Sequence, residues 1–61
     1  MSEKKKRDAK AIIEQLVNID IPELMTMVMA DAKTDASVRA ARVGLLSTSL
    51  HHLKLLRAAF E

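Results

Sequence analysis

The chain contains no cysteine among its 61 residues. This absence excludes disulfide bonds and metal sites built on thiolates, and it is typical of a protein from a reducing compartment. Tryptophan and tyrosine are also absent, and Phe60 is the only residue of the Phe, Trp and Tyr class. A hydrophobic core must therefore consist of aliphatic and methionine side chains, and recognition of single-stranded nucleic acid by aromatic stacking is unsupported.

Long apolar runs are missing as well. The longest uninterrupted apolar stretches are a few residues, far below the roughly 20 that a membrane-spanning helix needs. The basic start followed by Ala11–Ile13 has the order of a signal peptide, but Glu14, Asn18 and Asp20 interrupt the apolar region. We therefore expect neither a transmembrane helix nor a signal peptide, and we expect a cytoplasmic location.

The short length limits the core. A single domain of this size buries only about 60% of the surface that its unfolded chain exposes, and such domains often need a staple or association to be stable. Because no disulfide can supply the staple, the sequence predicts a homo-oligomer.

The formal net charge of +2 is unevenly distributed along the chain. Residues 1–10 contain five cations and two carboxylates, residues 11–35 contain one cation and five carboxylates, and residues 36–61 contain four cations and one carboxylate. This basic, acidic, basic order suits head-to-tail contacts between neighbouring molecules as well as binding to an anionic polymer.

The hydrophobic periodicity predicts an all-α fold of three helices, at about 5–19, 21–32 and 36–60. Residues 1–8 are expected to form a basic, partly frayed N-terminal arm, because like charges around the first turn repel, and residues 9–61 a single helical domain. The first helix carries apolar residues at the i, i+3, i+4, i+7, i+8 spacing: Ala9, Ile12, Ile13, Leu16 and Val17.

The predicted second helix has a clear start signal. Asp20 is placed to cap it, with Glu23 three residues later and Pro22 in the first turn, where no amide hydrogen is missed. Its three methionines either fill the core or form an adaptable groove for a partner: Met25, Met27 and Met29.

The third helix is expected after a short break near residues 33–36, where several helix-initiating residues lie. One unbroken helix from 22 to 60 is the alternative, since no Gly or Pro forbids it there. The apolar arc of the third helix also contains Val38, Leu45 and Arg42. It is too wide for the rest of the chain to cover, so we expect a two-sided interface. The leucine side comprises Leu46, Leu50, Leu53, Leu56 and Phe60, and the side of small residues comprises Ala40, Gly44 and Thr48.

Catalytic and metal-binding constellations are weak. Ser47 and His51 share a helical face, but an orienting acid, an oxyanion hole and a pocket are lacking. His51 and His52 diverge by about 100° on a helix and cannot chelate one metal. We expect no enzyme, no metal and no cofactor.

The basic residues are candidates for nucleic-acid contact, because cations that neutralise phosphates release counterions. Arg42 lies near the centre of the apolar arc, where a guanidinium needs either an acid, such as Asp31 or Asp35, or a path to water. No polar base-reading helix is evident, so the contact would be to backbone and weakly specific. The candidate residues are Lys4, Lys5, Lys6, Arg7, Lys10, Arg39 and Arg42.

Residues 22–46, PELMTMVMADAKTDASVRAARVGLL, resemble the helical hairpin of HEAT-like repeats, which is similar to hairpins in some phage small terminase subunits. The shared positions are packing residues. The chain departs from this pattern because one hairpin is not a solenoid and a separate helix-turn-helix domain is lacking. The resemblance implies a break near 33–36 and a bacterial or phage accessory protein.

Together these features predict a non-enzymatic, self-associating helical module that contacts nucleic-acid backbone through its basic arm. The alternative is a protein–protein adaptor or inhibitor that presents its apolar helix face to a host or partner protein. A salt-dependent binding measurement with nucleic acid separates the two.

Overall fold

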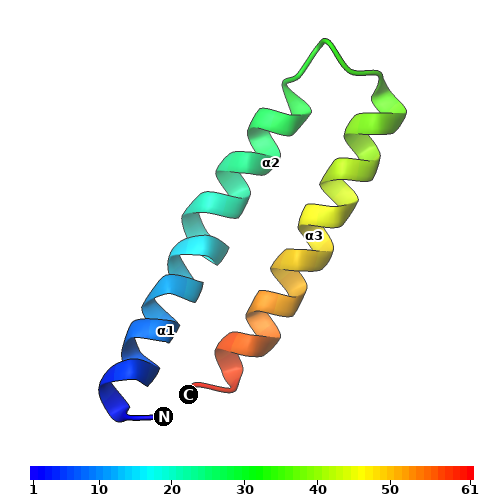
Figure 1. Cartoon of the computed structure of the whole chain (residues 1–61). Helices are drawn as coiled ribbons and strands as arrows, with labels where there is room; N and C mark the ends of the chain where they lie inside the picture. The colour runs from blue at the N-terminus through cyan, green and yellow to red at the C-terminus, as the bar shows by residue number, and fades with distance from the viewer.

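The computed structural model describes all 61 residues and is an antiparallel helical hairpin (Figure 1). The first arm joins α1 (Glu3–Gln15), the π-helical segment η1 (Leu16–Asp20) and α2 (Ile21–Met29), and the second arm is α3 (Ala36–Ala58). The predicted all-α fold is confirmed. The division into three separate helices is not, because helical backbone continues from Glu3 to Met29.

The predicted interruption at Asp20 is wrong. Asp20 has helical dihedral angles, φ −68° and ψ −47°, and its side chain makes no capping hydrogen bond. Instead of stopping, the helix widens, and the Ile21 N–H donates to the carbonyl of Leu16, five residues back. Pro22 explains where the widening occurs: it has no amide hydrogen, and its ring crowds the carbonyl four residues before it. A π-turn changes the hydrogen-bond register there.

The same π-turn aligns the core of the hairpin. Ile13, Val17 and Ile21 follow one another at intervals of four residues, a spacing that drifts by about 40° per step in a regular α-helix. The wider turn returns Ile21 to the line of Ile13 and Val17. These three side chains, 5–8% exposed, are the only buried residues of the chain.

The inner line of α3 has alternating spacings of four and three residues, as in a coiled-coil seam. It runs through the half-buried residues Arg39, Val43, Leu46, Leu50, Leu53 and Arg57, and the half-buried Phe60 continues it just beyond the end of the helix. The predicted arc therefore contributes four of its members to the seam. Val38, Leu45 and Leu56 lie beside the seam and are exposed, because a single opposing arm covers only a narrow stripe of the helix.

Residues 30–35 form the turn between the arms, so the predicted break is confirmed and the unbroken helix from 22 to 60 is excluded. The preceding helix ends at Met29, three residues before the predicted end. Asp35 caps α3: its Oδ1 accepts hydrogen bonds from the Val38 N–H at 2.9 Å and from the Ser37 hydroxyl at 2.7 Å. These hydrogen bonds lower the pKa of the Asp35 carboxyl below its usual value of 3.8.

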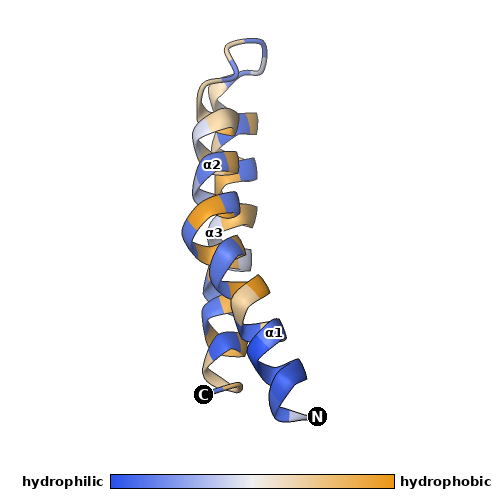
Figure 2. Ribbon diagram, turned by 90° about the vertical axis from the view of Figure 1, so that its left-hand side faces the viewer, coloured by the Kyte–Doolittle hydropathy of each residue, from blue (hydrophilic) through white to orange (hydrophobic).

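The hairpin is a rod of 46 × 15 × 12 Å with both termini at one end (Figure 1). Figure 2 shows that the first turns of α1 are hydrophilic and that hydrophobic residues recur along both arms beyond them. None of the helices combines the length and the apolar character that crossing a membrane requires.

Candidate functional site: a basic end and an apolar surface

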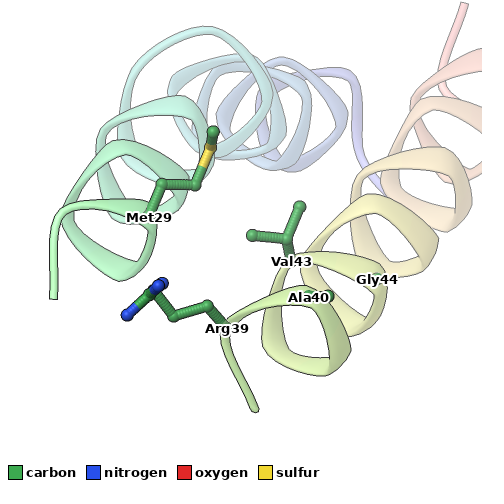
Figure 3. A pocket seen from close by; sticks show the side chains of 5 residues that line it. All are labelled: Met29, Arg39, Ala40, Val43 and Gly44. Atoms are coloured by element: carbon green, nitrogen blue, oxygen red, sulfur yellow. The ribbon is translucent and has the colours of Figure 1, made fainter. Parts of the chain in front are cut away.

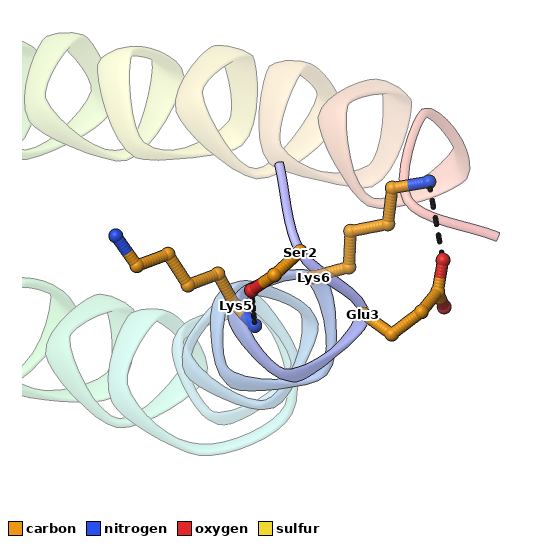
Figure 4. A network of polar contacts seen from close by, with 4 residues as sticks. All are labelled: Ser2, Glu3, Lys5 and Lys6. Carbon is orange, nitrogen blue, oxygen red and sulfur yellow. Dashed lines mark hydrogen bonds and ion pairs between the residues drawn. The ribbon is translucent and has the colours of Figure 1, made fainter.

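The cations near the N-terminus lie on the first turns of α1. Ser2 caps this helix, and its Oγ accepts the Lys5 N–H at 3.2 Å (Figure 4). Lys6 Nζ lies 3.8 Å from Glu3 Oε1 (Figure 4), the one salt bridge of the molecule. Lys4, Lys5, Arg7 and Lys10 therefore carry charges with no intramolecular ionic partner. The expected fraying of this arm stays a prediction.

Helical geometry distributes these cations around α1. At about 100° per residue, Lys4 and Arg7 fall on the side opposite Ile13 and so face away from the other arm. Both are exposed, whereas Lys6 and Lys10 are half-buried beside the seam. Lys4 and Arg7 are thus the exposed cations of this segment that point away from the other arm.

Folding brings the two basic segments of the sequence to one end of the rod. The hairpin places the last turns of α3, with Lys54 and Arg57, at the same end as the first turns of α1 (Figure 1). Residues 1–14 and 47–61 together carry seven cations and four carboxylates. The other half, residues 20–42 around the turn, carries three cations and four carboxylates. Charge counting along the chain missed this juxtaposition, which depends on the antiparallel fold.

The two remaining candidate cations, Arg39 and Arg42, lie at the turn end, away from the basic segment of α1. The Arg39 guanidinium donates to the carbonyl of Asp31 at 2.9 Å and to the carbonyl of Thr34. It therefore fastens the turn to α3. Arg42 is exposed and has no carboxylate partner. Of the two alternatives for Arg42, pairing with Asp31 or Asp35 is absent, and the exposed side chain reaches water.

The residues expected to form an interface separate into two groups. Leu46, Leu50, Leu53 and Phe60 are half-buried in the seam between the arms. The other four, Leu56, Ala40, Gly44 and Thr48, are exposed. Met27, a member of the possible methionine groove, is exposed, and so are Ile12, Leu24 and Leu55, which the sequence did not place in an interface. The positions of residues around a helix, taken from the sequence alone, do not distinguish those packed between the arms from the exposed ones beside them.

A cavity of about 460 Å³ opens beside the seam near the turn. Figure 3 shows Met29 of α2 and Val43 of α3 on its two walls, with Arg39 extending from α3 toward α2. Ala40 and Gly44 complete the lining, and a Cβ atom added at Gly44 would meet nothing within 4 Å. Two members of the small-residue row thus line an open cavity, and at Gly44 no other part of the chain is in contact.

The histidine and serine side chains of α3 form no constellation with an acid. Ser47 and His51 are exposed and share no hydrogen bond, and the rings of His51 and His52 lie 5.9 Å apart, centroid to centroid. No group of three His, Cys, Asp or Glu side chains is arranged to hold a metal ion.

Comparison with known proteins gives no relative: no protein-family model, no curated protein and no solved structure matches this chain. The similarity of residues 22–46 to a HEAT-like hairpin remains a resemblance at the level of sequence.

Proposed function

We propose that the protein is a non-enzymatic, self-associating helical hairpin that contacts the phosphate backbone of nucleic acid through its basic end. The observation that carries this proposal is the excess of cations in the half of the rod that contains the termini: seven cations stand against four carboxylates, and only Lys6 forms a salt bridge. Unpaired lysine and arginine side chains are available to displace the counterions of a polyanion.

The expected binding is electrostatic and weakly specific. If four or five of these cations contact phosphates of a duplex, the logarithm of the binding constant falls with the logarithm of salt concentration with a slope of about −4. Base recognition would need polar side chains set into a groove or aromatic stacking. The outward face of α1 presents Lys4 and Arg7 and no aromatic side chain, so affinity should depend little on nucleotide sequence.

Fluorescence anisotropy with labelled duplex DNA, single-stranded DNA and RNA, measured from about 20 to 200 mM salt, tests the proposal. Replacing two outward cations, Lys4→Gln with Arg7→Gln, should weaken binding about tenfold at low salt and make the slope shallower by about 1.8. The matched control is Lys33→Gln with Arg42→Gln, which removes the same charge at the turn end. It should change affinity less than about threefold.

Two results would count against the proposal. Absence of binding to every nucleic acid at the lowest salt would remove the function itself. Equal loss in the two double variants would show that net charge, and not the basic end, controls affinity.

A second candidate, an adaptor that binds a different protein, is favoured by the cavity beside Met29. A thioether side chain adapts easily to the shape of a partner, and the bare wall at Ala40 and Gly44 leaves room for an inserted side chain. This candidate would be left standing if the titrations with nucleic acid show no binding.

A further inference from the structure

The exposed apolar side chains of α3 are concentrated on one flank of the seam. Measured around the helix at about 100° per residue, Val38, Leu45 and Leu56 lie roughly 80–100° to one side of Leu46. Ala40 and Gly44 lie on the other side or behind. Leu45 is 70% exposed, and Val38 and Leu56 are exposed as well. The helix therefore has a second apolar stripe next to the one that packs against the first arm.

The first arm has a matching stripe. Leu24 and Met27 lie to one side of the buried Ile21, and Ile12 lies to the same side of the buried Ile13, whereas Met29 lies to the opposite side. Ile12, Leu24 and Met27 are all exposed, and the exposed fractions of Ile12 and Met27 are both 63%.

The two stripes lie on the same broad face of the hairpin. Each helix of the hairpin has residues to either side of its seam, reached by rotating one way or the other around the helix axis. Because the two helices are antiparallel and both right-handed, residues reached by the same sense of rotation lie on the same broad face of the pair. The cavity confirms this geometry, because Met29 on α2 and Ala40 and Gly44 on α3 share one rotational sense and line one cavity (Figure 3). The opposite face, which we call the apolar face, therefore collects Ile12, Leu24, Met27, Val38, Leu45 and Leu56.

The exposed area of the hairpin indicates how much of this surface needs cover. A folded monomer of 6.8 kDa is expected to expose about 4,000 Å², whereas this chain exposes 4629 Å². The excess of roughly 600 Å² approaches the ~800 Å² per partner of a standard interface. A second hairpin laid on the apolar face would remove about that area.

We infer that a second copy of this chain covers the apolar face, with its long axis reversed, so that two hairpins form a four-helix bundle. The inference rests on the self-association in the proposed function and adds the surface and the orientation. Charge selects the orientation. A parallel dimer would place two basic ends side by side, whereas the reversed copy places each basic end beside a turn half with more carboxylates than cations. In this arrangement α3 crosses the partner's α3 antiparallel, and the first arm crosses the partner's first arm.

Analytical ultracentrifugation of the whole chain tests the surface. The wild type should sediment as a dimer of twice 6.8 kDa, and Leu45→Glu with Leu56→Glu should raise the dimer dissociation constant by more than about 100-fold, because carboxylates would be buried unpaired. The matched control is Leu55→Glu. Leu55 is 59% exposed but lies behind the seam, outside the apolar face, so its replacement should leave the dimer intact.

A crosslinking experiment tests the orientation without depending on a destabilised variant. The chain has no cysteine, so Val38→Cys and Leu56→Cys introduce unique thiols at the two ends of the stripe on α3. With a short bismaleimide, an equimolar mixture of the two variants should give the mixed dimer, and each variant alone should give little product. Efficient crosslinking of Val38→Cys with itself would overturn the reversed orientation.

The outcomes separate this inference from the proposed function. If the wild type, the Leu45→Glu with Leu56→Glu variant and the Leu55→Glu control are all dimers, the apolar face is refuted as the interface while self-association stands. A wild-type monomer at all concentrations would refute both self-association and this interface. A wild type that sediments as a dimer and binds no nucleic acid at the lowest salt would refute nucleic-acid binding and leave the interface standing.

Discussion

At the scale of single residues, Asp35 connects a sequence signal directly to a structural role. The segment around residues 31–37 is rich in helix-capping residues, and the structure selects Asp35 among them, with Oδ1 accepting the Val38 N–H and the Ser37 hydroxyl. Asp31 is used differently: its Oδ1 accepts the Lys33 N–H at 3.1 Å and its carbonyl accepts the Arg39 guanidinium. The presence of several capping residues predicts the break, but it does not predict that Asp35 caps α3 while Asp31 forms hydrogen bonds within the turn. That difference depends on the conformation of the turn.

The lowered pKa of Asp35 predicts a specific dependence of stability on pH. Because the pKa of the folded carboxyl lies below the unfolded value, its stabilising contribution is present above about pH 4 and is lost as the pH falls through the folded pKa. Asp35→Asn keeps a capping oxygen but cannot ionise. Thermal melts followed by circular dichroism from about pH 6 to pH 2 should therefore show a smaller acid-induced loss of stability in the variant. Parallel losses in both proteins would assign the effect to other carboxyl groups.

At the scale of secondary-structure elements, α3 was predicted best. Its expected range of about 36–60 compares with Ala36–Ala58 in the structure, because a long periodic segment with a capping residue has few competing conformations. Its inner face was predicted only in part. The positions of its apolar residues around the helix predict one wide apolar arc. Because a hairpin has a single opposing arm, the buried seam is narrow, and Leu45 and Leu56 remain outside it.

The first arm shows why local signals were misleading. Asp20, Pro22 and Glu23 together are typical of a helix start, yet the backbone passes through them without a break. Packing decides this competition: Val17 and Ile21, on either side of the expected boundary, must both reach the seam. A π-turn satisfies the packing and the proline at once, and such turns have no sequence signature as clear as a capping box.

The π-turn predicts that the first arm tolerates proline at position 22 and not one turn later. Pro22→Ala should change the free energy of unfolding by less than about 1 kcal/mol, because the missing amide hydrogen falls where the hydrogen-bond register already changes. Thr26→Pro should cost about 3 kcal/mol or more, since it places the ring in the interior of α2. Urea denaturation measures both. A destabilisation by Pro22→Ala comparable to that of Thr26→Pro would contradict this account of the π-turn.

At the scale of the whole molecule, the sequence predicted association and uneven charge, but it did not predict where the basic residues and the exposed apolar residues lie on the folded hairpin. Short length, aliphatic composition and excess apolar surface all indicated association, and the charge blocks indicated a polyanion or a neighbouring molecule as partner. The convergence of two basic segments at one end follows from the direction of the hairpin (Figure 1). The apolar face follows from the rotational positions of residues on two separate arms. Neither property is visible until the arms are paired.

Association should make stability depend on protein concentration. Three buried residues are a small core for 61 residues, and a partner that binds only the folded hairpin stabilises it by mass action. A tenfold increase in concentration is then worth about 1.4 kcal/mol per dimer and should raise the melting temperature by several degrees. Circular dichroism melts over a hundredfold concentration range measure this directly. Leu45→Glu with Leu56→Glu should melt at a lower temperature with little dependence on concentration, while Leu55→Glu should retain the wild-type slope. A wild-type melting temperature independent of concentration would mean that the hairpin folds without its partner and that the apolar face contributes nothing to stability.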